Sequence, residues 1–316
     1  MDSDEMTFSG GEALFASLFD DAALFPPGDA PMAEAVPAHR LHRTSWYAGF
    51  VGPFICADTR LAELPADLVI SVVVTGGPGA VERIGPLPNA AALEVSGVAD
   101  PAGATAAVAA LRGRTGRDGD TAGFVEVPRT ACLPVLDALA GTGFFAKFRT
   151  GGLQARAFPS EAELAESIVG CVGRDLPFKC TAGLHHAVRH TATGTGFEHH
   201  GFLNVLLATS AALDGASAAE VAGVLALRDP AAVAGRIRVL GEDRAAATRR
   251  MFRSFGTCSI DEPLEDLAAL GLIGVRPGTA TKIPTATTSP TTATTATTTA
   301  ATTATTTTTP TAQERL

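Results

Sequence analysis

Several features that would place a chain in a familiar class are scarce in this sequence of 316 residues. Its five cysteines are odd in number, scattered and without CxxC spacing, so we expect core thiols in a reducing compartment. Positive charge is also short, with 24 Lys and Arg against 33 Asp and Glu. Because a nucleic-acid surface needs clustered cations, the sequence predicts no nucleic-acid partner.

Long apolar stretches are missing as well. The sequence contains no run of about 18 uncharged apolar residues, so we expect no membrane-spanning segment and no membrane partner. The N-terminal stretch MDSDEMTFSGG has neither the basic region nor the long apolar region of a secretory signal. These two absences predict a cytoplasmic protein.

The C-terminal end has almost no bulky apolar side chains. Between residues 283 and 312 nearly every residue is Thr, Ala or Pro, and none is charged. Such a segment cannot bury enough apolar surface to offset the entropy lost on ordering. We therefore predict a disordered Thr/Ala/Pro-rich tail at 279–316.

Short apolar runs alternate with helical patterns through most of the chain. Strands are expected at 46–57, 67–75, 91–98, 123–127, 144–149 and 176–181, with a last strand inside 249–258. Helices are expected between these strands, at 11–25 and 31–43 before them, and at 202–213, 217–227 and 230–239 after residue 200. This alternation is typical of βαβ units that build a parallel sheet.

An open doubly wound sheet and a closed eight-stranded barrel both fit this alternation. Four successive strands each carry one charged residue, namely Glu94, Glu126, Lys147 and Lys179. A barrel interior can gather such groups near its carboxyl end, whereas helices cover both faces of an open sheet. The sequence therefore favours an α/β fold with a TIM-type (β/α)8 or closely related parallel barrel at 44–278. An N-terminal helical segment, 1–43, is expected to pack on it, and its C-terminal region is expected to be helical.

Two lysines lie in the middle of apolar strands, in FFAKFR and PFKC. Side chains alternate along a strand, so Lys147 and Arg149 share one face and Lys179 lies on the matching face of the next strand. Three neighbouring cations repel one another, which activates an amine, unless an anion or the two glutamates neutralise them. The alternative is a buried ionic network that only holds the barrel together.

Part of the sequence resembles a known family. Residues 145–152, FAKFRTGG, resemble the Schiff-base strand of deoxyribose-phosphate aldolases, in which a lysine in an apolar strand precedes a Thr-Gly turn. Residues 178–183, FKCTAG, resemble the next strand of that family, whose lysine tunes the first and whose glycines bind the sugar phosphate. The resemblance covers Phe144 to Gly183 and implies class I aldolase chemistry, with Lys147 forming the imine and Lys179 tuning it.

The sequence also departs from that pattern. Gly152 replaces the basic residue expected after the turn, and His185 and His186 stand where the phosphate-loop glycines should end. No aspartate matches the proton shuttle of the family well, although Asp67 and Asp100 are nominal candidates. Asp20 and Asp21 are expected to be cap or turn residues. The motifs FPPG, FRTGG and AGLHH are also similar to those of a bacterial protein group to which we attach no activity.

Our leading hypothesis is a lyase or aldolase that acts on a small anionic, carbonyl-containing or phosphorylated metabolite. Lys147 is its amine or electrostatic catalyst, Lys179 its tuner, and Glu126 and His185 its proton carriers. The residues expected to bind the substrate or its anion are Arg149, Thr150, Gly151, Gly152, Thr181, Gly183, Glu94 and Asn204. This mechanism requires no cofactor.

The histidine-rich stretch 185–200 supports a second hypothesis, a metal-dependent hydrolase or lyase. Imidazoles four positions apart can share a divalent ion such as zinc, with a glutamate supplying an oxygen. The candidate ligands are His186, His190, His199 and His200. They are also compatible with general acid–base work by one histidine at the barrel mouth, or with partly exposed loop histidines that hydrogen-bond to backbone. A third hypothesis is a non-catalytic binding protein, and the sequence leaves homo-oligomer formation open.

Overall fold

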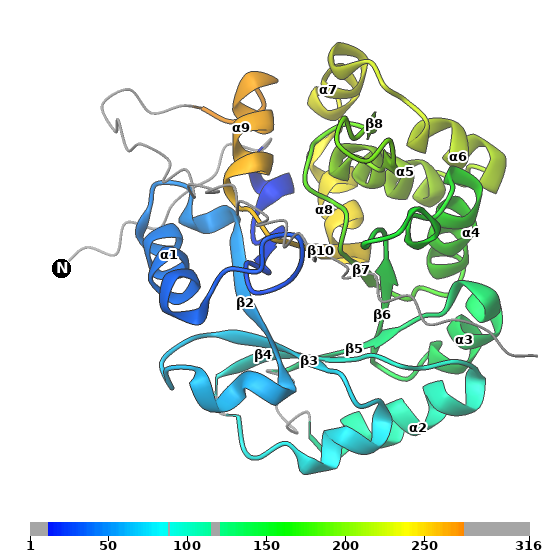
Figure 1. Ribbon diagram of the computed structural model, residues 1–316. Coiled ribbons are helices and arrows are strands. Elements are labelled where there is room, and N and C mark those ends of the chain that lie inside the picture. Colours follow the sequence, from blue (N-terminus) through cyan, green and yellow to red (C-terminus); the bar gives the residue numbers. More distant parts are fainter. Residues whose placement is uncertain (1–11, 88, 115–120, 275–316) are drawn as a thin grey trace, which may run out of the picture. The chain divides into compact units, whose positions relative to one another are not determined.

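The structure is a computed structural model that describes residues 12–87, 89–114 and 121–274. Eight parallel strands close into a barrel in the order β1-β10-β7-β6-β5-β4-β3-β2 (Figure 1). The barrel strands are β1 (Phe19–Asp21), β2 (Val51–Ala57), β3 (Ile70–Val74), β4 (Ala90–Val95), β5 (Ala122–Glu126), β6 (Phe145–Arg149), β7 (Phe178–Thr181) and β10 (Phe252–Thr257). The predicted closed parallel barrel of the TIM type is confirmed.

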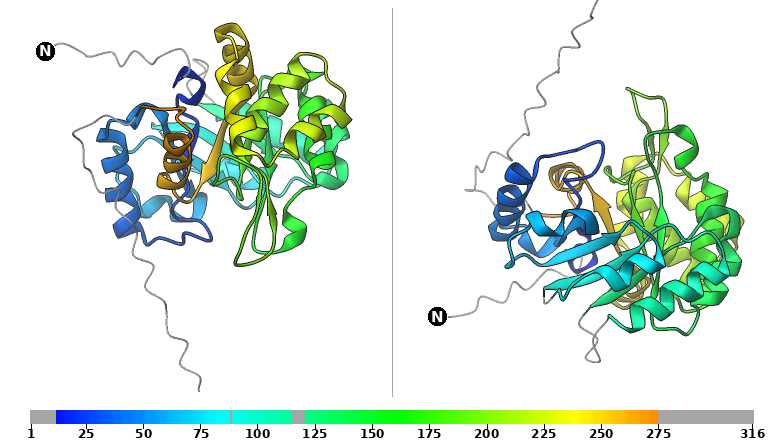
Figure 2. Two further views of the ribbon diagram at one scale, coloured as in Figure 1. Left: turned by 90° about the horizontal axis from the view of Figure 1, so that it is seen from above. Right: turned by 60° about the horizontal axis from the view of Figure 1, so that its bottom comes forward.

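Helices cover the outside of the barrel (Figures 1 and 2). The first four are α1 (Met32–Thr44), α2 (Pro101–Arg112), α3 (Cys132–Leu139) and α4 (Glu161–Val172). Short 3₁₀ helices, η3 (Asp58–Glu63) and η4 (Pro78–Arg83), follow β2 and β3. Side chains cap helix N-termini as the sequence indicates, for example at α4 and α2. Ser160 and Glu163 form a reciprocal capping box at α4, and the Asp100 carboxylate accepts a hydrogen bond from the first turn of α2.

The connection between β7 and β10 is long and mostly helical. It begins with an antiparallel pair, β8 (His190–Thr191) and β9 (Glu198–His199). The helices α5 (Phe202–Leu213), α6 (Ala218–Leu225), α7 (Pro230–Arg238) and α8 (Glu242–Met251) follow, and α9 (Asp261–Ala269) comes after β10. In Figure 1 the helices α5 and α6 lie beside α4, and contacts between these three helices agree with that view.

The N-terminal part of the chain differs from the sequence-based expectation. The helix expected at 11–25 is replaced by a short 3₁₀ helix, η1 (Glu12–Phe15), and by strand β1. Segment 1–43 therefore contributes the first barrel strand as well as helix α1. All three residues of β1 are buried, and they pair with β10 on one side and β2 on the other. These pairings with distant segments outweigh the local helical pattern.

Two smaller differences concern element boundaries. The strand expected at 46–57 begins only at Val51, because residues 48–50 form the 3₁₀ helix η2 (Ala48–Phe50). Helix α8 was not predicted, and its residues include no continuous apolar face long enough to signal it.

The apolar core lies between the barrel strands and the surrounding helices. Phe19, Phe202 and Phe255 pack with ring centroids 5.2 to 5.7 Å apart, which fixes α5 against β1 and β10. On β6 and β7, Phe148 and Phe178 also belong to this core, as the alternation predicts. The opposite face of the same strands therefore points into the barrel, where the charged residues lie.

All five cysteines are free thiols, and four of them are buried. In the described part of the chain no helix is long and apolar enough to cross a membrane. The tail predicted at 279–316 lies outside the described residues.

Candidate functional site

The two barrel lysines lie side by side in the barrel interior. Lys147 on β6 pairs in register with Lys179 on β7, and Glu126 on β5 pairs with Lys147. Both lysine side chains are almost fully buried. The strand pattern therefore brings these groups together in the barrel interior, as the alternation of side chains predicts.

Lys179 is held tightly by two carboxylates. Its Nζ lies 2.5 Å from Asp20 Oδ2 and 2.6 Å from Glu94 Oε1. Burial alone lowers the pKa of Lys179, but the charges and hydrogen bonds of these carboxylates outweigh burial and raise it above the ordinary value. Lys179 therefore stays protonated. The sequence left open whether the lysines are activated by mutual repulsion or neutralised by carboxylates. Lys179 is neutralised by carboxylates.

Hydroxyl groups complete the shell around these carboxylates. Ser71 donates to Glu94 Oε1 over 2.6 Å, and Ser254 donates to Asp20 Oδ2 over 2.7 Å. Burial disfavours ionised Glu94, but Lys179 and Lys147 outweigh it and lower the pKa of Glu94 to about 2. Burial raises the pKa of Asp20, against the opposing effect of Lys179. Glu94 is the carboxylate shared by the two lysines.

Lys147 is held more loosely than Lys179. Its Nζ lies 3.2 Å from Glu94 Oε2, 3.2 Å from Glu126 Oε2 and 3.4 Å from Ser96 Oγ. Glu94 Oε2 is buried and accepts no hydrogen bond from any of the described residues. The lysine of β6 thus sits between two carboxylates without the short contacts that fix its neighbour.

Glu126 and Arg149, at the carboxyl end of the barrel, are the members of this group of charges that are partly exposed to solvent. The Glu126 side chain is 21% exposed, accepts a hydrogen bond from Ser96, and lies 3.7 Å from Arg149 Nε. Arg149 is half exposed. The pKa of Glu126 is lowered because Lys147 and Arg149 outweigh the effect of burial. We call the alternating row Arg149, Glu126, Lys147, Glu94, Lys179 and Asp20 the barrel network.

Sequence reasoning missed Asp20, which was expected to be a cap or turn residue. It lies on β1, where only three residues form the strand, so the pattern carried no strand signal. Ser71, Ser96 and Ser254 were missed as well, because serines in or next to a strand are common and do not by themselves indicate a site. A cavity of about 160 Å³ adjoins the network and is lined by Glu126, Arg129, Arg149, Glu163 and Ser167, among others.

The turn residues proposed to hold an anion come together at the carboxyl ends of β6 and β7. The Thr150 hydroxyl donates to the carbonyl of Ala182, and its backbone N–H donates to Thr181. A Cβ on Gly151 would lie 2.6 Å from Gly183 Cα, so only glycine allows this approach of the two turns. Gly152 packs against Ala157, where a Cβ would lie 2.9 Å away. Arg149 and Thr181 pair in register beside them.

His185 lies near α9 and makes no described contact with the barrel lysines. Its Nδ1 lies 2.8 Å from Glu262 Oε2 and 3.8 Å from Cys258 Sγ. Burial lowers the pKa of His185, but Cys258 and Glu262 outweigh it and raise the pKa to about 10. A histidine protonated at neutral pH suits proton donation better than general base work.

The remaining candidate metal ligands form a row of rings. The centroids of His186 and His190 are 4.8 Å apart, and those of His190 and His199 are 5.1 Å apart. His186 pairs with Asp266, while His190 and His199 hydrogen-bond to backbone carbonyls. In residues 12–87, 89–114 and 121–274, no three His, Cys, Asp or Glu side chains are placed to hold a metal ion.

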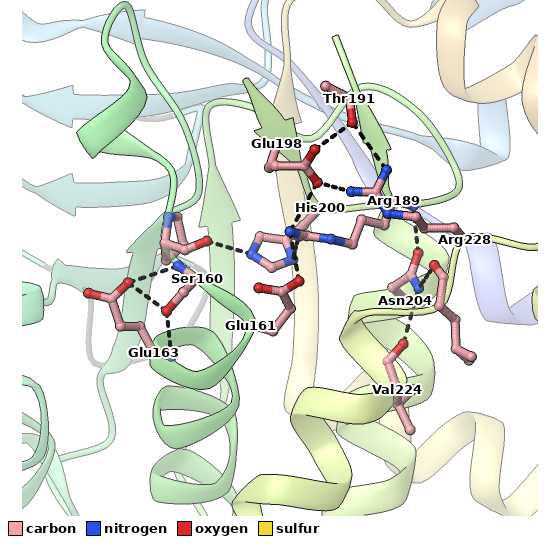
Figure 3. Close-up of polar contacts among 12 residues, drawn as sticks. Ser160, Glu161, Glu163, Arg189, Thr191, Glu198, His200, Asn204, Val224 and Arg228 are labelled. Atoms are coloured by element: carbon pink, nitrogen blue, oxygen red, sulfur yellow. Dashed lines mark hydrogen bonds and ion pairs between the residues drawn. The ribbon is translucent and has the colours of Figure 1, made fainter. Parts of the chain in front are cut away.

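His200 and Asn204 belong to a separate buried cluster (Figure 3). His200 Nε2 donates to the Pro159 carbonyl over 2.8 Å, so its Nδ1 accepts from Arg189 over 3.3 Å. Arg189 also contacts Glu161 over 2.7 Å and Glu198 over 3.2 Å. We call Glu161, Arg189, Glu198, His200, Asn204 and Arg228 the loop network.

Asn204 has no free polar group in the loop network. Its Oδ1 accepts from the Arg189 N–H, and its Nδ2 donates to the carbonyls of Val224 and Leu227. The network therefore ties the β8–β9 loop to helices α4, α5 and α6. Arg189 was not identified from the sequence, because its burial depends on the fold of that loop.

Comparison with known proteins adds no family. No protein-family model matches this chain, and a search of curated proteins finds no significant match. The resemblance to deoxyribose-phosphate aldolases is therefore supported only at the level of the parallel eight-stranded barrel.

Proposed function

We propose that this protein is an enzyme that forms an imine between Lys147 and a small carbonyl compound carrying an anionic group. The single observation that carries the proposal is that Lys179 has closer ionic contacts than Lys147. Lys179 has contacts of 2.5 and 2.6 Å, whereas the contacts of Lys147 are all 3.2 Å or longer. An amine that is to react must leave its ionic partners, and Lys147 has the weaker set.

The barrel network divides the work between the two lysines. Lys179 remains charged and fixes Glu94, which in turn orients Lys147. Glu126 lies between Lys147 and the solvent-exposed carboxyl end, so it is the carboxylate that can exchange protons with both amine and substrate.

The reaction balances with these groups alone. Glu126 takes one proton from the Lys147 ammonium, and the free amine attacks the carbonyl carbon of the substrate. The same proton then returns to the oxygen of the addition product, which leaves as water with a second proton from the nitrogen. The product is a protonated imine, and the sum is one ammonium and one carbonyl giving one iminium and one water.

The anionic group of the substrate fits the carboxyl end of the barrel. Arg149 is half exposed there, and Arg129 lines the adjoining cavity with it. A guanidinium group can bind a carboxylate or phosphate through two parallel hydrogen bonds. The turns at Gly151 and Gly183 lie next to Arg149, and their backbone N–H groups are the ones proposed to face the anion.

Borohydride trapping tests this proposal. The chain has three lysines, Lys147, Lys179 and Lys282, and each can be followed separately by mass spectrometry of peptides. With short aldehydes and ketones bearing phosphate or carboxylate, we expect a reduced adduct on Lys147 and none on the other two. Lys147→Met and Lys147→Arg should both abolish it, and the arginine variant keeps the charge. No adduct, or equal labelling of all three lysines, would remove the imine mechanism.

A non-catalytic barrel is the second candidate. Each lysine of the network has carboxylate partners and is buried, as expected of an ionic cluster that only shapes the interior. Replacing a buried ionic group by an apolar side chain of similar size is then often neutral or stabilising. A Lys147→Met protein with unchanged stability, together with a wild type that yields no adduct, would favour this candidate.

A further inference from the structure

A second cavity lies at the opposite, amino end of the barrel. Its volume is about 370 Å³, more than twice that of the cavity beside Glu126. The lining residues come from the segment before β1, from the amino-terminal parts of the barrel strands and from the end of α8. Those on the strands include Ser71 on β3, Ala92 on β4, Phe124 on β5 and Lys179 on β7. We call it the amino-end pocket. In TIM-type barrels the residues on this face usually contribute to stability and not to an active site. A polar cavity there therefore requires a separate explanation.

Positive charge dominates the amino-end pocket. Arg249 and Arg250, from the end of α8, and Arg253, from β10, line it together with Lys179. Among the described residues the lining contains one carboxylate, Asp20, and its charge is already matched by Lys179. None of the ion pairs found within the described residues involves the three arginines.

Within the described part of the chain, two of these arginines are held in place by groups other than carboxylates. Arg249 donates to the backbone carbonyls of Ala16 and Phe252. The guanidinium carbon of Arg253 lies 5.7 Å from the centroid of the Phe145 ring. Burial and the neighbouring Arg253 lower the pKa of Arg249 to about 10, so it still carries its charge at neutral pH. Positioned cations without counter-charges attract an anion into a concave site.

We propose that the amino-end pocket binds a small phosphate-bearing molecule. The guanidinium groups match the oxygens of a phosphate in geometry and charge. The other walls are small or apolar, with Ala16, Ala91, Ala122 and Phe124, and they leave room for a short organic part. Basic residues also suit the last turn of α8, whose dipole they complement, but that role does not account for Arg253 or for the cavity. This site does not depend on the function proposed for Lys147.

Titration calorimetry with inorganic phosphate and with glycerol phosphate, at constant ionic strength set by sodium chloride, measures the binding. We expect saturable binding of both. The double variant Arg250→Ala/Arg253→Ala should weaken it at least about tenfold, the loss expected when charge-assisted hydrogen bonds are removed. Arg249 is left unchanged, because it also supports the backbone. The matched control is Arg236→Ala, an exposed arginine on α7 outside the pocket, which should bind as the wild type does.

A second measurement uses only the wild-type protein. Phenylglyoxal modifies accessible arginines, and peptide mass spectrometry reports each site. Inorganic phosphate should protect Arg250 and Arg253 and leave Arg236 reactive. Two results would each overturn the proposal: no phosphate binding above the chloride background, or protection that is the same at Arg236 as in the pocket.

Discussion

The barrel network and the loop network both bury charged side chains, but the two networks differ in how completely the polar atoms are hydrogen-bonded. In the loop network His200 uses both ring nitrogens, and Asn204 uses its oxygen and its amide nitrogen (Figure 3). In the barrel network one oxygen of Glu94 accepts no hydrogen bond from the described residues, and Lys147 has only contacts of 3.2 Å or more.

This difference distinguishes the loop network, which supports the structure, from the barrel network, which is the candidate site. A buried polar network whose groups are all paired fixes one conformation, because any movement leaves a group unpaired in a medium of low dielectric. The loop network thus holds a long connection in place. The barrel network is fixed at Lys179 and looser at Lys147, and its loose part faces the partly exposed Glu126. A group that must exchange partners during a reaction belongs at such a place.

The largest expected effect comes from removing the tightly held lysine. Lys179→Met leaves Asp20 and Glu94 as buried carboxylates without their main partner, so we expect a loss of about 3 to 5 kcal/mol in the free energy of unfolding. Lys147→Met should cost less than about 2 kcal/mol, since Glu94 keeps Lys179 and Glu126 reaches solvent. Urea unfolding measures both. Equal losses would show that the two lysines are held alike.

The barrel was predictable because its signal is local and repeated. Each of β3 to β7 is a short apolar run followed by a helix or turn, and the alternation of side chains along a strand places Lys147 and Lys179 on one face. The strand β1 was not predictable in the same way. Its three residues become a strand only through pairing with β2 and β10, so the role of Asp20 could not be derived from its neighbours in the sequence.

The histidines show a different limit. Their spacing suggested shared chemistry, but which of them meet depends on the β8–β9 loop and on α9, which is distant in the sequence. His185 therefore pairs with Glu262, and His200 with Arg189, neither of which the spacing indicates. Only contacts across the fold decide such pairs.

An intermediate effect is expected in the loop network. Asn204→Ala removes three hydrogen bonds and leaves the carbonyls of Val224 and Leu227 without these donors, so we expect a loss of about 2 to 3 kcal/mol. Urea unfolding measures the loss. If the loop network is only scaffold, the variant that remains folded should form the Lys147 adduct as readily as the wild type. A specific loss of the adduct in fully folded protein would make Asn204 part of the site.

The smallest expected effect concerns pH, because acid should weaken the loop network and the barrel network over different pH ranges. Burial lowers the pKa of His200 from 6.5 to about 4, so the unfolded chain takes up its proton first. The stability that neutral His200 provides is complete above pH 6.5 and falls as the pH drops from 6.5 to about 4. The pKa of Glu94 is lowered from 4.5 to about 2, so its contribution is lost only below pH 4.5. Acid should therefore weaken the loop network before this part of the barrel network.

Comparison of the wild type with His200→Gln isolates the first step. The glutamine amide can still donate to Pro159 but takes up no proton, so the difference in unfolding free energy between the two proteins should shrink by about 1 to 3 kcal/mol between pH 6.5 and 4. Urea unfolding at a series of pH values measures it. A difference that stays constant over this range would mean that His200 does not titrate as a buried, neutral group. That result would contradict the hydrogen-bonded position of His200 in the loop network.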